Sequence, residues 1–382
     1  MKRCARCLLP ETQETMVLDS GGICSVCRQH EYKKEKIDWA GRKKQFSAIL
    51  DEYRGKYDYD CIIPFSGGKD SAYTAYALIK EYGLKPLIVS FDHWFYRPKH
   101  EQRVVKTLKK LGADYLRFRP NWHVVRKLML ETLIRKGDFC WHCHTGVFSY
   151  PMHVALKFNI PLIIWGEPSA EYTSYYDYSE PEEVNEARFN RWVNLGITAD
   201  DMLGMLGDPK ITMRDLKPFQ YPPEKELRRL KCRSICLGSF APWDVKRQSE
   251  IIKNELGWEG DVVEGIPREY YYEKVECSMQ GVRDYLKFLK RGFGRTAHLV
   301  SLDLRNGRIT KEKAEELVGK YDGKRPASLD VFLEYVGIDE EEFLNIVAKN
   351  VVAPHVWDKD KVKSLPRGEK LYDQNQWDRT KA

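Results

Sequence analysis

The sequence predicts an α/β fold with a parallel sheet, preceded by a small cysteine-rich unit and followed by a mostly helical region. Three observations lead to this expectation. Short apolar runs alternate with helical segments from about residue 58 to residue 258, an order typical of parallel sheets covered by helices. Two pairs of cysteines open the chain. After about residue 260, apolar residues repeat mainly at helical spacing.

These observations divide the 382 residues into four predicted parts, in keeping with a length too great for one small core. They are a cysteine-rich unit (1–32), a linking helix (33–57), the α/β domain (58–258) and a mostly helical C-terminal domain (259–382). The apolar content of 42% argues against disorder, and no apolar run is long enough for a membrane span. No long apolar segment follows the first residues, so we expect a cytoplasmic protein.

The charged residues are 63 basic and 56 acidic, which gives a net charge of +7, and they are mixed along the chain. This distribution favours a solvated surface over a nucleic-acid interface. A modest positive balance also suits an enzyme whose substrates carry several phosphates.

The first element is a candidate metal site formed by two C-x-x-C pairs. Sixteen residues separate Cys4 and Cys7 from Cys24 and Cys27. In a cytoplasmic protein we expect cysteines as thiols or metal ligands rather than as disulfides. Two such pairs can supply four thiolates to one tetrahedral Zn²⁺, which leaves no open position for catalysis. We therefore predict a structural zinc ribbon, in which the ion substitutes for a core that so short a segment cannot build.

The α/β domain is predicted to begin with a strand that ends at Ser66. The next elements are expected in the order helix 72–82, strand 87–91, helix 101–111, strand 114–118, helix 122–136 and strand 160–165. In a parallel sheet the carboxyl ends of the strands meet at one edge, and ligands bind there. Ser66, Asp92, Gly166 and Glu167 all follow such strand ends, so we expect them to line one site.

The turn after the first strand, Ser66-Gly-Gly-Lys-Asp-Ser71, has the composition of an anion site. Glycines let backbone N–H groups face a small concavity, the next helix contributes its positive N-terminal end, and Lys69 adds a full charge. The turn matches neither G-x-x-x-x-G-K-S/T nor G-x-G-x-x-G. It resembles the PP-loop of the ATP pyrophosphatase superfamily, which has a HUP-like fold and splits ATP between its α and β phosphates. The resemblance implies nucleotide contacts from Ser66, Gly67, Gly68, Lys69, Asp70, Ser71, Asp92 and Gly166.

A second cysteine cluster lies at Phe139-Cys-Trp-His-Cys-His144. Cys140, Cys143 and two imidazoles could bind a metal ion, form a redox pair, or hold an iron–sulfur cluster with a third, distant cysteine. Cys277 and Cys232 are the candidates for that third ligand, with Cys236 after them. The alternative is a structural turn rich in buried thiols.

A polar, aromatic stretch, residues 169–201, directly follows the strand that ends before Gly166. Its position predicts a long loop over the site, with a packed helical hairpin as the alternative. Its aromatic faces and charges would suit a sugar nucleotide.

Several motifs occur in the order found in one bacterial family. They are the four N-terminal cysteines, Ser66–Ser71, the segments 140–144, 163–167 and 284–295, Ile309-Thr310 and Tyr321–Lys324. In this order the chain closely resembles bacterial N-acetyl sugar amidotransferases of the WbpG/PseA type. One departure lies at Gly166-Glu167-Pro168, where an asparagine would be expected after the glutamate.

The resemblance implies an ATP-dependent, AMP-forming conversion of a sugar acetamido group into an acetamidino group, in O-antigen or surface polysaccharide synthesis. It implies that Lys69 and the loop hold the departing pyrophosphate, that Asp70 and more weakly Asp92 bind Mg²⁺, and that Glu167 orients ammonia or accepts its proton. A HisH-like glutaminase and a HisF-like subunit would supply ammonia. The acceptor would be a nucleotide sugar or a sialic-acid-like sugar.

Two other functions remain open from the sequence. A PP-loop tRNA thiolase would share the loop and the zinc ribbon, and its C-x-x-C would carry a persulfide or a 4Fe–4S cluster. The cluster at Cys140 favours that function, whereas the C-terminal motifs and the weakly basic charge oppose it. The other alternative is a non-catalytic zinc-ribbon binding protein with a degenerate nucleotide fold.

Overall fold

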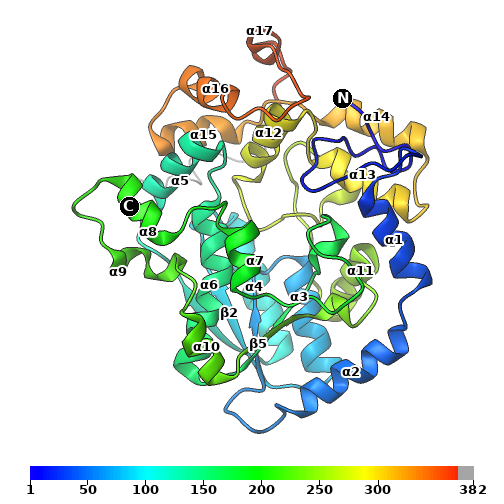
Figure 1. Cartoon of the computed structure of the whole chain (residues 1–382), viewed down its shortest axis with the longest axis vertical. Helices are drawn as coiled ribbons and strands as arrows, with labels where there is room; N and C mark the ends of the chain where they lie inside the picture. The colour runs from blue at the N-terminus through cyan, green and yellow to red at the C-terminus, as the bar shows by residue number, and fades with distance from the viewer. Residues whose placement is uncertain (369–382) are drawn as a thin grey trace.

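Figure 1 shows the protein as a computed structural model, which describes residues 1–368. Its centre is a parallel sheet with the strand order β3-β2-β1-β4-β5. The strands are β1 (Cys61–Pro64), β2 (Pro86–Phe91), β3 (Asp114–Phe118), β4 (Leu162–Trp165) and β5 (Arg233–Cys236). The predicted α/β class with a parallel sheet is confirmed. The last residues of the predicted C-terminal domain, 369–382, lie outside the described residues.

The strand order places a topological switch between β1 and β4. The chain adds β2 and β3 on one side of β1, then crosses over to add β4 and β5 on the other side. At such a switch the connections leave in opposite directions, so a crevice opens at the carboxyl ends of the two strands. Ser66 follows β1 by two residues, and Glu167 follows β4 by two residues. The sheet therefore brings these two predicted site segments to one crevice.

Both faces of the sheet are buried under helices. Ile63 packs into a core with α3 (Lys69–Tyr76), α4 (Pro98–Leu111) and α11 (Val245–Leu256). Ile62 faces the opposite core, under α6 (Trp141–Phe158). Successive residues of a strand point to opposite faces, and for this reason the strands read as continuous apolar runs.

The N-terminal unit consists of the cysteine-containing turns, α1 (Ser25–Glu35) and α2 (Trp39–Asp51). Instead of the single linking helix expected over 33–57, α1 begins within the second cysteine pair and the chain breaks at 36–38. The Asp38 carboxylate accepts a hydrogen bond of 3.0 Å from the Gly41 amide and so caps α2. A capping aspartate satisfies free amides of a new helix, and this explains why the helical pattern restarts there.

The C-terminal part is mostly helical, as predicted. Its helices are α12 (Gln280–Arg291), α13 (Arg295–Arg305), α14 (Lys311–Tyr321), α15 (Ser328–Val336), α16 (Glu340–Ala348) and α17 (Lys359–Lys363). Residues of α12, α15 and α16 share a core with α5 (Trp122–Lys136). Phe293 and Ala297 instead pack against the N-terminal cysteines, so α13 lies beside the N-terminal unit (Figure 1).

Two elements near the site are absent from the sequence prediction. β5 is short and carries Arg233 and Ser234, so it lacks the apolar run of the other strands. α6 contains the second cysteine cluster in its first turn and Pro151 in its interior, features that ordinarily mark a turn. Its Thr145 and Ser149 hydroxyls donate to the carbonyls of Trp141 and Thr145, four residues earlier, at 2.6 Å each.

Shorter helical segments complete the described chain. They are η1 (Ala77–Glu81), η2 (Ser169–Glu171), α7 (Glu186–Arg188), η3 (Phe189–Val193), α8 (Ala199–Leu206), α9 (Met213–Leu216), η4 (Lys217–Phe219), α10 (Glu224–Leu230), η5 (Leu237–Ser239) and η6 (Arg268–Tyr270). Within residues 1–368, every helix is too short or too polar to cross a lipid bilayer.

Candidate functional site

The loop between β1 and α3 is held in a tight curve by its own hydroxyls. The amides of Ser66 and Gly67 donate to Ser71 Oγ at 3.2 and 3.1 Å, and the Gly68 amide donates to Ser66 Oγ at 3.2 Å. Gly67 has φ +77°, and a Cβ there would lie 2.6 Å from Val104. The loop therefore requires glycine at 67, and it delivers the unpaired first-turn amides of α3 to the crevice.

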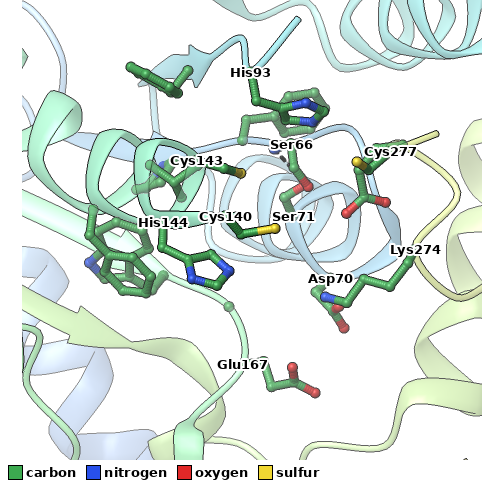
Figure 2. Close-up of a pocket in the computed structure, with 18 of the residues that line it drawn as sticks. Ser66, Asp70, Ser71, His93, Cys140, Cys143, His144, Glu167, Lys274 and Cys277 are labelled. Atoms are coloured by element: carbon green, nitrogen blue, oxygen red, sulfur yellow. Dashed lines mark hydrogen bonds between the residues drawn. The ribbon is translucent and has the colours of Figure 1, made fainter. Parts of the chain in front are cut away.

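The loop opens into a cavity of about 310 Å³ whose walls come from distant parts of the chain (Figure 2). Ser66, Asp70, Ser71, Gly166 and Glu167 form a polar end. Val89, Phe91, Val147, Phe148, Pro151 and Trp165 form an apolar wall. The remaining wall contains Cys140, Cys143, His144, Lys274, Glu276, Cys277 and Arg283. An apolar slot beside an anion-binding end can accept a nucleoside with its phosphates.

Two carboxyl groups at the polar end have oxygens without partners. Asp70 Oδ1 and Glu167 Oε1 are buried, and neither has a hydrogen-bond partner among residues 1–368. Burial and the neighbouring Asp70 charge raise the pKa of Glu167 well above its ordinary value. A carboxylate oxygen without a donor suits a hard cation, so Asp70 fits Mg²⁺ at this end of the cavity.

Lys69 does not line the cavity. Its Nζ lies 2.8 Å from an Asp70 oxygen and 2.8 Å from a Glu273 oxygen, and its side chain is 5% exposed. Burial lowers the pKa of Lys69, but the charges of Asp70, Glu273 and Glu167 outweigh burial and raise the pKa above its ordinary value. In the structure Lys69 pairs with Asp70 and Glu273, and its predicted contact with phosphate stays a prediction.

Asp92 is also placed away from the cavity. It is completely buried, pairs with Arg117 and Arg119, and accepts a hydrogen bond of 2.8 Å from the Trp94 amide. Its oxygens are thus engaged by protein donors, and the next residue, His93, lines the cavity instead. Gly166 does lie at the cavity, and a Cβ there would approach Thr74 Oγ1 to 2.5 Å, so glycine lets β4 run close to α3.

The second cysteine cluster faces the same cavity as the loop. Cys140, Cys143 and Cys277 point into it from the start of α6 and from the segment before α12 (Figure 2). The Cys277 segment is held in place by a bridge to Tyr96 and by Arg97, whose Nε donates to the Cys277 carbonyl at 3.2 Å. Cys236 also lines the cavity, whereas Cys232 packs in the core under α6. Three thiols from two distant segments thus face one cavity, and thiolates are the usual protein ligands of iron–sulfur clusters.

The four N-terminal cysteines form a closed cluster. All four are buried, and their sulfurs lie within 4.8 Å of one another. The Cys4–Cys27 and Cys7–Cys24 sulfur distances are 3.9 and 3.6 Å. Tetrahedral Zn²⁺ with bonds of about 2.3 Å needs sulfurs about 3.8 Å apart. The residues therefore fit a structural zinc ion, which they would enclose completely.

The N-terminal unit contacts the loop that follows Glu167. Ser174 N donates to Thr15 Oγ1 at 2.9 Å, Ser25 and Ser174 share a hydrogen bond of 2.7 Å, and Gln13 donates to the Tyr172 carbonyl at 3.3 Å. Lys33 pairs with Glu171. The expected long loop after β4 is therefore present, and it lies between the N-terminal unit and the cavity, to which it contributes Val184 and Arg188.

Sequence reasoning missed Lys274, Glu276, Arg283 and Arg188. The first three surround Cys277, which the sequence did single out, so its neighbours were the available signal. Arg188 pairs with Glu182 and lies over the rings of Phe148, Tyr176 and Trp192. Arg295 and Arg308, in the C-terminal part, pair with Asp284 and Asp244, respectively.

The strand order and the loop at its switch point define an α/β domain of the PP-loop type. Residues 264–372 match the family described as LPS biosynthesis protein WbpG-like, C-terminal domain, so the resemblance to WbpG-type proteins is confirmed for that part of the chain. No curated protein matches the sequence.

The solved structures that match this chain include a synthetase and a tRNA thiolase. NMN synthetase from Francisella tularensis has a TM-score of 0.33 and 11% identity, over 75% of this chain and 93% of that one. The U34-tRNA thiolase NcsA from Methanococcus maripaludis, solved with its 4Fe–4S cluster, has a TM-score of 0.28 and 13% identity. That alignment covers 82% of this chain and 89% of the thiolase.

Proposed function

We propose that the protein is an ATP-dependent amidotransferase that converts the acetamido group of a sugar into an acetamidino group and releases AMP and pyrophosphate. The description of the matched family supports a place in lipopolysaccharide or related surface polysaccharide synthesis. One observation carries the proposal. The WbpG-like segment supplies Lys274, Glu276, Cys277 and Arg283 to the cavity into which the Ser66–Ser71 loop opens.

The chemistry starts from an amide, which resists ammonia because its oxygen is a poor leaving group. The amide oxygen bonds to the α-phosphorus of ATP, the bond from that phosphorus to the bridging oxygen breaks, and pyrophosphate leaves with the electron pair. Ammonia then attacks the activated carbon, the carbon–oxygen bond breaks, AMP leaves, and the nitrogen loses a proton. The protein must hold two reactants in line and neutralise phosphate charge.

The residues of the polar end have distinct roles in this proposal. Ser66, the loop and the N-terminus of α3 hold the phosphates. Asp70, anchored by Lys69, would hold Mg²⁺, which supplies charge neutralisation when bound. Glu167 accepts the proton released when ammonia adds, and its raised pKa makes it a better base than an ordinary glutamate.

Incubation with ATP, ammonium chloride and UDP-linked acetamido sugars, followed by mass spectrometry, tests the function. Replacement of oxygen by NH lowers the mass of the acceptor, and AMP should form in equal amount. Formation of ADP instead of AMP, or an unmodified acceptor with every sugar offered while ATP is consumed, would contradict the proposal.

Replacing Glu167 with glutamine should separate the two half-reactions. We expect pyrophosphate exchange into ATP to continue, because the adenylation step does not need this base. Amidine formation should fall by roughly 10²-fold to 10⁴-fold. Equal loss of both half-reactions would show that Glu167 is not the base of the amination step alone.

A tRNA thiolase is the second candidate, because three thiols face the nucleotide cavity. For either function we propose Cys140, Cys143 and Cys277 as the ligands of an iron–sulfur cluster, and not Cys232. After anaerobic purification, Cys277→Ser should lose iron and visible absorption, and Cys232→Ser should keep both. An iron-free, colourless parent protein would contradict the proposed cluster. A sulfur-bearing tRNA product would favour the thiolase function.

We propose a HisH-like glutaminase and a HisF-like channelling subunit as the sources of ammonia, and a cytoplasmic location where ATP and nucleotide sugars are available. Glutamine should replace ammonium chloride only when both partners are added. Glutamine-dependent product formation by this chain alone would contradict the partner proposal.

A further inference from the structure

Two basic side chains face the cavity without direct contact to a carboxylate of the described chain. Lys274 and Arg283 both line it, and no residue within 1–368 gives either side chain a hydrogen bond or an ion pair. Other basic groups near the cavity are engaged: Lys69 by two carboxylates, Arg188 by Glu182 and Arg295 by Asp284. A cation that is taken out of bulk water without a partner is costly unless a ligand supplies the opposite charge.

Lys274 is distinguished from Arg283 by its place in the cavity. Arg283 lies on the thiol side, where its charge acts on Cys140 and Cys143. The Lys274 ammonium reaches toward the polar end that holds Asp70 and Glu167 (Figure 2). This end is the one that receives phosphates in the proposed reaction, and the charge of Lys274 acts there on Glu167, Glu273 and Glu276.

The backbone conformation of Lys274 gives a second, independent indication that its side chain serves a ligand in the cavity. Its φ is +48°, in the left-handed region that side chains with a Cβ rarely adopt. Glu273, the residue before it, is turned into the protein to bind Lys69, and the left-handed residue then directs its own side chain into the cavity. Strain of this kind tends to persist where a side chain must be aimed for function.

We infer that Lys274, rather than Lys69, is the lysine that contacts the phosphates of ATP in this cavity, an inference that rests on the proposed function. As the α-phosphorus bonds to the acceptor oxygen and the bond to the bridging oxygen breaks, Lys274 neutralises the negative charge on the phosphate oxygens. Lys69 stays between Asp70 and Glu273 and contributes only through Asp70. The SGGKDS lysine and the phosphate-binding lysine are thus two different residues in this protein.

The chain contains a matched control for this test. Lys231 is also a lysine with a left-handed backbone, at φ 56°, but it is exposed at the end of α10 and outside the cavity. Glycine relaxes both positions, so neither Lys274→Gly nor Lys231→Gly should lower the thermal midpoint. Only the first removes a charge from the cavity.

Calorimetric titration with Mg²⁺ and α,β-methylene-ATP measures the effect without any need for the acceptor. We expect Lys274→Gly to weaken binding by about 10-fold to 100-fold, the loss of one charged hydrogen bond. Lys274→Arg should recover most of the affinity, and Lys231→Gly should bind as the parent does. Lys274→Met, which keeps the stem of the side chain, should behave as Lys274→Gly.

Unchanged affinity in Lys274→Gly and Lys274→Met, with a parent that binds the analogue, would overturn this inference and leave the proposed function intact. Failure of the parent to bind the analogue would overturn the proposed function, and with it the phosphate contact. Equal loss of affinity in Lys231→Gly would also count against the inference, because it would assign the effect to backbone relaxation rather than to charge.

Discussion

Chelation of the metal held by Cys4, Cys7, Cys24 and Cys27 should unfold the N-terminal unit and stop amidine formation, although no residue of that unit lines the cavity. The unit has few apolar side chains of its own, and its core residues surround the four sulfurs. Structural zinc in units of this size contributes about 10–16 kcal/mol at pH 7.

Activity should be lost because the unit supports the loop that begins at Glu167. Thr15, Ser25 and Gln13 bond to residues 172–174, and Lys33 pairs with Glu171. Hydrogen exchange should therefore accelerate in residues 1–35 and also in 169–179, while strands β1 and β2 stay protected. Binding of α,β-methylene-ATP at the Ser66 loop should be weakened less than amidine formation.

Readdition of Zn²⁺ to the chelated protein is the control, and it should restore both protection and activity. Cys4→Ser should reproduce the effect of chelation, since it removes one of the four ligands. Unchanged exchange in 169–179 after complete metal removal would show that the loop does not depend on the ribbon.

The parts of the site that could be predicted from the sequence are those formed by residues close together in the chain. The turn from Ser66 to Ser71 and the two C-x-x-C pairs each combine special residue types within a short span, and both have the predicted geometry. Strand 114–118 and helix 122–136 agree with the structure at both ends, because polar or turn residues flank each apolar pattern.

The parts that were missed depend on contacts between distant segments. Lys274 and Arg283 lie in a region whose sequence shows only helical spacing, and nothing local reveals that the Cys277 segment pairs with Tyr96 at the cavity. Lys69 and Asp92 had the right residue type beside the right strands. In the structure Glu273 and Arg117, remote in sequence, pair with their charged groups, and no local pattern reveals these ion pairs.

Replacing Lys69 with methionine should cost about 3–5 kcal/mol of unfolding free energy, the usual effect of removing one member of a buried ion pair. The substitution leaves Glu273, whose side chain is 4% exposed, without its ion-pair partner, and it also frees Asp70. Urea unfolding measures the loss. Lys313→Met is the control, because Lys313 pairs with Glu316 at 2.9 Å, the two side chains are 50% and 59% exposed, and the pair lies outside the cavity. Its loss should be about 1 kcal/mol or less.

The stability that the Lys69–Glu273 ion pair contributes should depend on pH, and the pKa shifts of the two groups give the direction. Burial raises the pKa of Glu273, but Lys69 and Lys274 outweigh burial and hold the pKa below its ordinary 4.5. The corresponding stability is present above pH 4.5 and is lost as the pH falls through the lowered pKa. The raised pKa of Lys69 contributes stability that is present below pH 10.5 and is lost as the pH rises through the raised value. The difference between parent and Lys69→Met should be largest between these limits.

The double variant Lys69→Met/Glu273→Gln tests whether Lys69 only holds Asp70 in place or also contacts the phosphates of ATP. It removes both charges of the buried pair, so it should recover much of the stability that Lys69→Met loses. If Lys69 acts only by holding Asp70, the stabilised double variant should bind α,β-methylene-ATP more tightly than Lys274→Gly does, because the cavity keeps its own cation. If its affinity were as low as that of Lys274→Gly while its stability recovered, Lys69 would have to leave Glu273 and contact the phosphates when ATP binds. The assignment of two separate lysines would then be wrong.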